Sequence, residues 1–122
     1  MLEVENVLAV MNVADLEQVA PWYERLFGRP PDRRPMETVV EWQLGVTGGL
    51  QVVLDAERAG KSSLTLGVGD IDDALRDIAA RGLHGTAETV GEQNGVPLRI
   101  AILQDPAGNM VVLALAAASR PA

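Results

Sequence analysis

The sequence predicts an α+β fold built from two similar βαβββ modules, and three observations lead to this prediction. A strand end, helix cap and helix start occur twice, at residues 13–17 and 68–72, 55 positions apart. A glycine-led final strand also occurs twice, at residues 49–54 and 108–113, 59 positions apart. The chain of 122 residues has room for one domain with a real core and for only two copies of such a unit. A period near 55 exceeds the common solenoid repeats, so we expect one duplicated module.

The first module opens with a strand and a helix. Residues 7–13 are a short apolar run rich in β-branched side chains, which is typical of a strand. Asp15 follows as a helix N-cap, because its carboxylate can accept hydrogen bonds from the first free backbone N–H groups. Proline lacks an N–H, so we expect an initial turn followed by a main helix with Pro21 in its first turn. Gly28 is the expected end of this helix.

Three further segments complete the first module. Residues 29–35 contain three prolines, which predicts a surface loop, with a weak strand near residues 36–38. Strands are expected at Val39–Leu44 and Leu50–Asp55. The glycine-rich residues 45–49 predict the turn between them.

The second module repeats this order. Ser63–Val68 is the expected first strand, Asp70 the helix cap and Ile71–Arg81 the helix. Three more strands are expected at residues 86–90, 98–103 and 109–115. We therefore predict one domain, residues 1–122, divided into a first module over 1–58 and a second over 59–117.

Composition limits the classes of partner. Hydrophobic residues make up 48% and charged residues 22% of the chain, which is a globular balance. The formal net charge of −7 disfavours nucleic acid and favours a cationic or neutral ligand. The sequence has no cysteine, which excludes disulfides and thiolate chemistry and fits a reducing compartment. We expect a cytoplasmic protein with no membrane partner, because no apolar run approaches the roughly 20 residues that span a bilayer.

Four motifs resemble one known superfamily. Residues 12–16 (NVADL), 22–28 (WYERLFG), 68–74 (VGDIDDA) and 105–109 (DPAGN) are similar, in this order, to motifs of the vicinal-oxygen-chelate superfamily, which includes glyoxalases, bleomycin resistance proteins and dioxygenases. The resemblance implies the glyoxalase/bleomycin resistance fold, in which the two modules form an incompletely closed, eight-stranded, barrel-like sheet, and it implies a homodimer. Its members include metal-dependent lyases, isomerases and extradiol dioxygenases, and also metal-free proteins that sequester drugs, so the fold does not decide the function.

The resemblance also implies four metal-ligand positions, one on the first and one on the last strand of each module. Counted from the helix caps and from the final strands, these positions carry Leu8, Val53, Ser63 and Val112. Divalent cations require oxygen or nitrogen donors, which two valines and a leucine do not supply. We therefore expect no metal and no cofactor.

Period-two alternation assigns the two faces of each predicted sheet. One apolar set is expected to pack under the helices; it comprises Val52, Leu54, Leu64, Leu66, Val68, Val111, Leu113 and Leu115. The other set mixes apolar with small polar side chains, as a ligand cup does; it comprises Leu8, Val10, Asn12, Gln51, Val53, Asp55, Ser63, Thr65, Gly67, Met110, Val112 and Ala114. A cup filled by its own side chains, or a dimer contact, is the alternative.

Candidate ligand-binding residues follow from this assignment. Trp42 lies mid-strand and would stack on a planar ligand, with ordinary core packing as the alternative. Arg99 lies on the comparable strand of the second module and would pair with an anionic ligand or with Asp55. The complete set is Trp42, Asp55, Arg99, Ser63, Asn12 and Met110.

No residue is singled out as catalytic. Asp55, Glu41 and Asp105 are the carboxylates expected nearest the cup, and no two of them have a spacing that demands paired acid–base chemistry. The only histidine, His84, is expected on the surface or at a helix C-terminus.

The leading hypothesis is a metal-free small-molecule-binding protein, with sequestration of a drug or toxin as one role. The alternatives are a metal-dependent lyase, isomerase or extradiol dioxygenase, a cofactor-free isomerase that uses Asp55, and an interaction domain without a ligand.

Overall fold

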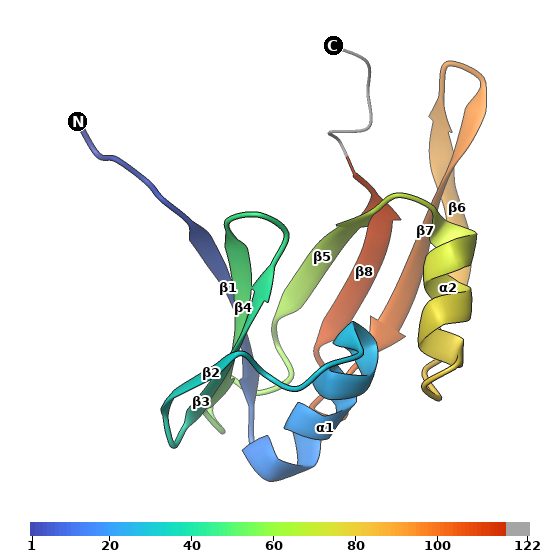
Figure 1. Cartoon of the computed structure of the whole chain (residues 1–122). Helices are drawn as coiled ribbons and strands as arrows, with labels where there is room; N and C mark the ends of the chain where they lie inside the picture. Colours follow the sequence, from blue (N-terminus) through green and yellow to red (C-terminus); the bar gives the residue numbers. More distant parts are fainter. Residues whose placement is uncertain (117–122) are drawn as a thin grey trace.

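The structure is a computed structural model in which residues 1–116 are described. It contains two four-stranded sheets, ordered β1-β4-β3-β2 and β5-β8-β7-β6, which lie side by side with one helix each (Figure 1). The elements in chain order are β1 (Val7–Val13), α1 (Leu16–Phe27), β2 (Arg33–Met36), β3 (Val39–Leu44), β4 (Gly48–Leu54), β5 (Ser63–Val68), α2 (Ile71–Ala79), β6 (Thr86–Gln93), β7 (Val96–Gln104) and β8 (Met110–Leu115).

This order confirms the predicted pair of βαβββ modules. In each module the first strand pairs in parallel with the fourth, and the remaining pairs are antiparallel. The eight strands form two separate hydrogen-bonded sheets, and within residues 1–116 they do not close into a barrel. The last position of the second predicted module, residue 117, lies outside the described residues.

Helix α1 differs from its prediction because it accommodates Pro21. It runs without a break from Leu16 to Phe27, with Asp15 accepting a hydrogen bond from the Gln18 backbone N–H at 3.1 Å. Pro21 is exposed, so the carbonyl group that loses its usual N–H partner lies on the solvent side of the helix. The predicted end is confirmed, since Gly28 adopts a left-handed φ of 74°.

The predicted proline-rich loop is shorter than expected. Its second half is the strand β2, which includes Pro35 and whose residues are all exposed. Proline is tolerated there because β2 is an edge strand that pairs irregularly with β3. The hairpin of β6 and β7 is also longer than predicted and projects from the molecule in Figure 1. Its turn is Asn94-Gly95, and both residues have positive φ, as two-residue hairpin turns require.

Both helices pack on the same side of the two sheets, and one apolar cluster joins them. The predicted helix-facing set is largely confirmed, because Val52, Leu64, Val111 and Leu113 are buried in this cluster. Leu54 and Leu115 are the exceptions, since they are 41% and 52% exposed at the strand ends.

A buried polar network joins the modules. The Tyr23 hydroxyl on α1 donates to Asp105 in the β7–β8 turn at 2.6 Å, and the Asn109 side-chain amide donates to the Asn12 carbonyl oxygen on β1 at 2.9 Å. Burial is the main cause that raises the pKa of Tyr23 above its ordinary value of 10.0, and the hydrogen bond to Asp105 adds to it. Asp105 therefore lies at the module junction, and the expectation that it lies near the cup is wrong.

Among the described residues, no helix is long and apolar enough to cross a membrane.

Candidate functional site

Each sheet has one face that carries no helix, and we call it the helix-free face. On the first module it is formed by alternate residues of four neighbouring strands, and it remains largely open. Its residues include Leu8 and Val10 on β1, Gln51 and Val53 on β4, Glu41 and Gln43 on β3, and Arg33 on β2.

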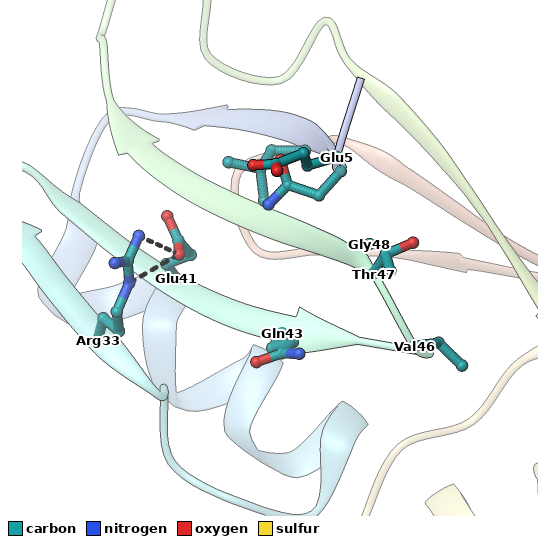
Figure 2. A pocket seen from close by; sticks show the side chains of 9 residues that line it. Glu5, Arg33, Glu41, Gln43, Val46, Thr47 and Gly48 are labelled. Carbon is teal, nitrogen blue, oxygen red and sulfur yellow. Dashed lines mark hydrogen bonds and ion pairs between the residues drawn. The ribbon is translucent and has the colours of Figure 1, made fainter. Parts of the chain in front are cut away.

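The helix-free face of the first module contains a cavity of about 400 Å³. Leu8, Arg33, Glu41 and Gln43 line it, and the β3–β4 turn, residues 46–48, closes one end. Figure 2 shows Arg33 and Glu41 pointing toward one another at one side of this cavity. We call this cavity the module 1 pocket.

A charged row runs along the helix-free face from β2 to β4. It consists of Arg33 and Glu41, which line the module 1 pocket, and of Gln51, the cross-strand partner of Glu41. The Arg33 guanidinium donates to Glu41 Oε2 through Nε at 2.9 Å, and Arg33 Nη2 lies 2.6 Å from the same oxygen. The Gln51 side-chain amide donates to Glu41 Oε1 at 3.0 Å. The Glu41 side chain is 10% exposed whereas that of Arg33 is 65% exposed, so the row holds an inner carboxylate with an outer cation.

These contacts favour the ionised form of Glu41. The hydrogen bond from Gln51 is the largest cause that lowers the pKa of Glu41 below its ordinary value, and Arg33 lowers it further, whereas burial acts in the opposite direction. A carboxylate with a lowered pKa is a weak proton acceptor near neutral pH. Glu41 is therefore suited to hold a charge at a fixed place rather than to act as a general base.

The pairing of strands corrects one of the four expected ligand positions. Leu8 and Ser63 remain equivalent, because Asp15 and Asp70 both cap helices 55 positions apart. In the second module Thr65, two residues after Ser63, pairs with Val112. In the first module Val10, two residues after Leu8, pairs with Gln51, so Gln51 rather than Val53 is equivalent to Val112.

The corrected set of Leu8, Gln51, Ser63 and Val112 still does not suit a divalent cation. It offers one amide and one hydroxyl and no charged oxygen, whereas hard cations take several oxygen ligands that usually include carboxylates. Gln51 is also already bonded to Glu41. Within residues 1–116, no group of three or more histidine, aspartate or glutamate side chains is placed to hold a metal.

The second module has a row in the same register but with different chemistry. Val112 pairs with Ile102, and Ile102 pairs with Thr86, just as Gln51 pairs with Glu41 and Glu41 with Arg33. We call Val112, Ile102 and Thr86 the apolar row. A second cavity, of about 390 Å³, is lined by Ile102, Thr86, Met110 and His84. Each module thus has a cavity beside its row.

Three predicted ligand-binding residues lie on strands at the helix-free faces. By strand register, Ser63 on β5 and Asn12 on β1 lie on the helix-free faces of their modules. Met110 on β8 is 44% exposed and lines the second cavity. Within residues 1–116, none of the three has a hydrogen bond or ion pair with the charged row.

Two other predicted residues lie on the opposite face, and those predictions are wrong. Trp42 is fully buried against α1, where its ring lies 5.5 Å from that of Phe27 and its indole N–H donates to the Arg29 carbonyl oxygen. Its alternative interpretation as core packing is confirmed. Arg99 pairs with Asp72 on α2 at 3.1 Å.

Asp55 lies just beyond β4 and is bonded within its own turn. Its carboxylate accepts from the Arg58 backbone N–H at 3.2 Å and pairs with the Arg58 side chain at 3.0 Å. It does not contact Arg99 among the described interactions.

The sequence alone does not point to Arg33 and Gln43 as pocket residues, and it indicates Glu41 only as a carboxylate near the cup. Arg33 was assigned to a loop, so nothing placed it beside Glu41. Cross-strand register was the signal that would have joined them, because Arg33 pairs with Glu41 and Glu41 with Gln51.

Residues 8–114 match the Glyoxalase-like domain family. The chain belongs to this family. The resemblance to the vicinal-oxygen-chelate superfamily is thereby confirmed. No curated protein matches the chain.

Solved structures agree with this assignment. A glyoxalase/bleomycin resistance protein from Catenulispora acidiphila DSM 44928 is 30% identical, with a TM-score of 0.81 over 93% of this chain and 99% of that chain. A bleomycin-binding protein in complex with bleomycin is 19% identical, with a TM-score of 0.66 over 95% and 99% of the two chains. A lactoylglutathione lyase from Agrobacterium tumefaciens is 17% identical, with a TM-score of 0.68 over 89% and 91%. The last two show the shared fold alone, and they differ in role, since one binds bleomycin and the other is a lyase.

Proposed function

We propose that this glyoxalase-like chain is a small-molecule-binding protein that holds its ligand on the helix-free faces without a divalent metal, with sequestration of a drug or toxin as its role. The observation that carries the proposal is the donor set at Leu8, Gln51, Ser63 and Val112, which has no charged oxygen. The cavities of about 400 and 390 Å³ are of the size that small ligands occupy.

An enzymatic role is less well supported by the same residues. A metal-dependent lyase or dioxygenase needs ligands that these positions lack. A cofactor-free isomerase needs a carboxylate free to accept a proton, whereas Asp55 is bonded to Arg58 and Glu41 to Arg33 and Gln51.

We also propose a cytoplasmic homodimer. Apolar side chains remain exposed on the helix-free face, with Val10 and Met110 as examples, and on the projecting hairpin, with Val96 as an example. A second copy of the chain would cover such surfaces. Sedimentation at micromolar concentration should show a dimer, and a monomer would contradict this part of the proposal.

Paramagnetic Mn²⁺ tests the metal-free site. We expect only weak, dispersed broadening of amide signals when Mn²⁺ is added to the ¹⁵N-labelled protein, because the corrected positions offer no charged donor. A fragment screen in the presence of chelator should still yield ligands that shift amides of the helix-free faces. Stoichiometric Mn²⁺ binding with selective broadening at Leu8, Gln51, Ser63 and Val112 would refute the proposal.

A further inference from the structure

The module 1 pocket carries a net negative charge that its own contacts do not cancel. Its lining includes Glu5, Glu41 and Arg33, so two carboxylates face one guanidinium. Glu5 has no hydrogen-bond or ion-pair partner among the described residues. The whole chain adds to this potential, with a formal net charge of −7.

Glu41 keeps the capacity to bind a further donor. A carboxylate has about four lone-pair sites, and among the described residues the Glu41 carboxylate has hydrogen bonds or ion pairs only with Arg33 and Gln51. Arg33 belongs to a short, exposed edge strand, and its own side chain is mostly exposed. An ion pair with such an exposed partner contributes little stability, so a ligand cation can displace Arg33 at small cost.

The side chains around Glu41 suit a ligand that has a cationic group attached to an apolar group. The Gln43 side-chain amide and Asn6 line the pocket, and neither has a side-chain hydrogen bond within the described part of the chain. Leu8 and Val46 supply apolar surface at the rim, where Val46 is 90% exposed. An anionic group would instead be repelled by Glu5 and Glu41. The cation that lines the pocket, Arg33, is already paired with Glu41.

We propose that the module 1 pocket binds the positively charged nitrogen group of its ligand, an amidinium, guanidinium or ammonium, through Glu41 in competition with Arg33. This rests on the proposed function that the helix-free face holds a small molecule. Gln43 and Asn6 accept further hydrogen bonds from the same group, and Leu8 and Val46 contact its apolar part.

Benzamidine and its neutral analogue benzamide test this assignment, because they share a shape and differ in charge. Amide shifts of the ¹⁵N-labelled full chain, recorded in chelator, should show benzamidine at Gln43, Thr47 and Gly48 and much weaker binding of benzamide. Glu41→Gln should weaken benzamidine binding about tenfold, because it removes a charged acceptor. Arg33→Gln should strengthen it about threefold or more, because it removes the competing cation.

Two matched variants control for net charge. Arg34→Gln changes the charge as Arg33→Gln does, but Arg34 pairs with Glu17 on the helix side. Glu37→Gln matches Glu41→Gln in the same way, and Glu37 does not line the pocket. Both should leave the benzamidine affinity within about twofold of the parent chain, since screened charges outside the pocket act weakly.

The two substitutions are expected to change the benzamidine affinity in opposite directions. If Glu41→Gln fails to fold, the increase in affinity expected for Arg33→Gln still tests the inference. Weaker binding on Arg33→Gln, equal binding of benzamide, or no benzamidine shifts in the pocket would overturn the inference. If other fragments still bound the helix-free faces in chelator, the proposed function would stand while this inference failed.

Discussion

The helix-free faces of the two modules share a backbone register and differ in chemistry. In the first module the row beside the cavity is Arg33, Glu41 and Gln51, a carboxylate held by two donors. The equivalent row of the second module is Thr86, Ile102 and Val112. The helix-facing sides of both sheets share one apolar cluster, so the modules are alike in their core and differ on their helix-free faces. We therefore expect the two cavities to bind different chemical groups.

The largest effect is expected where the modules join. Asp105→Ala should destabilise the chain by about 3–5 kcal/mol, because it leaves buried donors from Tyr23 and Asn109 without an acceptor. Urea unfolding measures this loss. Asp55→Ala, at an aspartate bonded to Arg58 at the surface, should cost about 1 kcal/mol or less. Similar losses for both variants would show that the junction does not hold the modules together.

A smaller effect tests whether the rows are equivalent. Ile102→Glu should cost about 1–3 kcal/mol, because it puts a half-buried carboxylate among apolar side chains without a partner. Adding Thr86→Arg should recover about 0.5–1 kcal/mol beyond additivity, because Thr86 pairs with Ile102 as Arg33 does with Glu41. A double-mutant cycle by denaturant unfolding measures this coupling. If the two substitutions changed the free energy of unfolding strictly additively, the apolar row and the charged row would not be equivalent.

The smallest effect is the pH dependence that Glu41 contributes. The folded pKa of Glu41 lies below its ordinary value of 4.5, so Glu41 adds stability above that pH and loses it as the pH falls through the folded pKa. Glu41→Gln should therefore flatten the decline of stability below about pH 4.5, relative to the parent chain. Stability curves between acidic and neutral pH compare the two proteins. An unchanged acid slope would mean that the contacts to Glu41 in the charged row do not stabilise its ionised form.

The fold could be predicted from the sequence because its signals are local and occur twice. The caps Asp15 and Asp70 bond as expected, and Ser63–Val68 was predicted to the residue. The errors occurred where tertiary context overrides local chemistry. Pro21 fits inside α1 because it is exposed, and Pro35 fits in β2 because an edge strand does not need its N–H.

The candidate site was harder to predict because it depends on register. Alternation placed Gln51 on the open face correctly, but a sequence offset of 59 aligned Val53 with Val112, whereas the strand pairs give Gln51. Period-two alternation also does not reveal which of the two faces of β3 carries the tryptophan. Trp42 packs against α1 because the aromatic side chains of that helix lie over β3, which no local pattern encodes.

One measurement tests the difference between the two helix-free faces most directly. Amide shifts of the ¹⁵N-labelled chain are recorded in chelator with benzamidine and, separately, with indole, an uncharged aromatic. The account predicts that benzamidine shifts Gln43, Thr47 and Gly48 in the module 1 pocket, and that indole shifts Thr86, Ile102 and Met110 in the second cavity. Shifts of both probes in the same cavity, or binding that appears only when a divalent metal is restored, would contradict it.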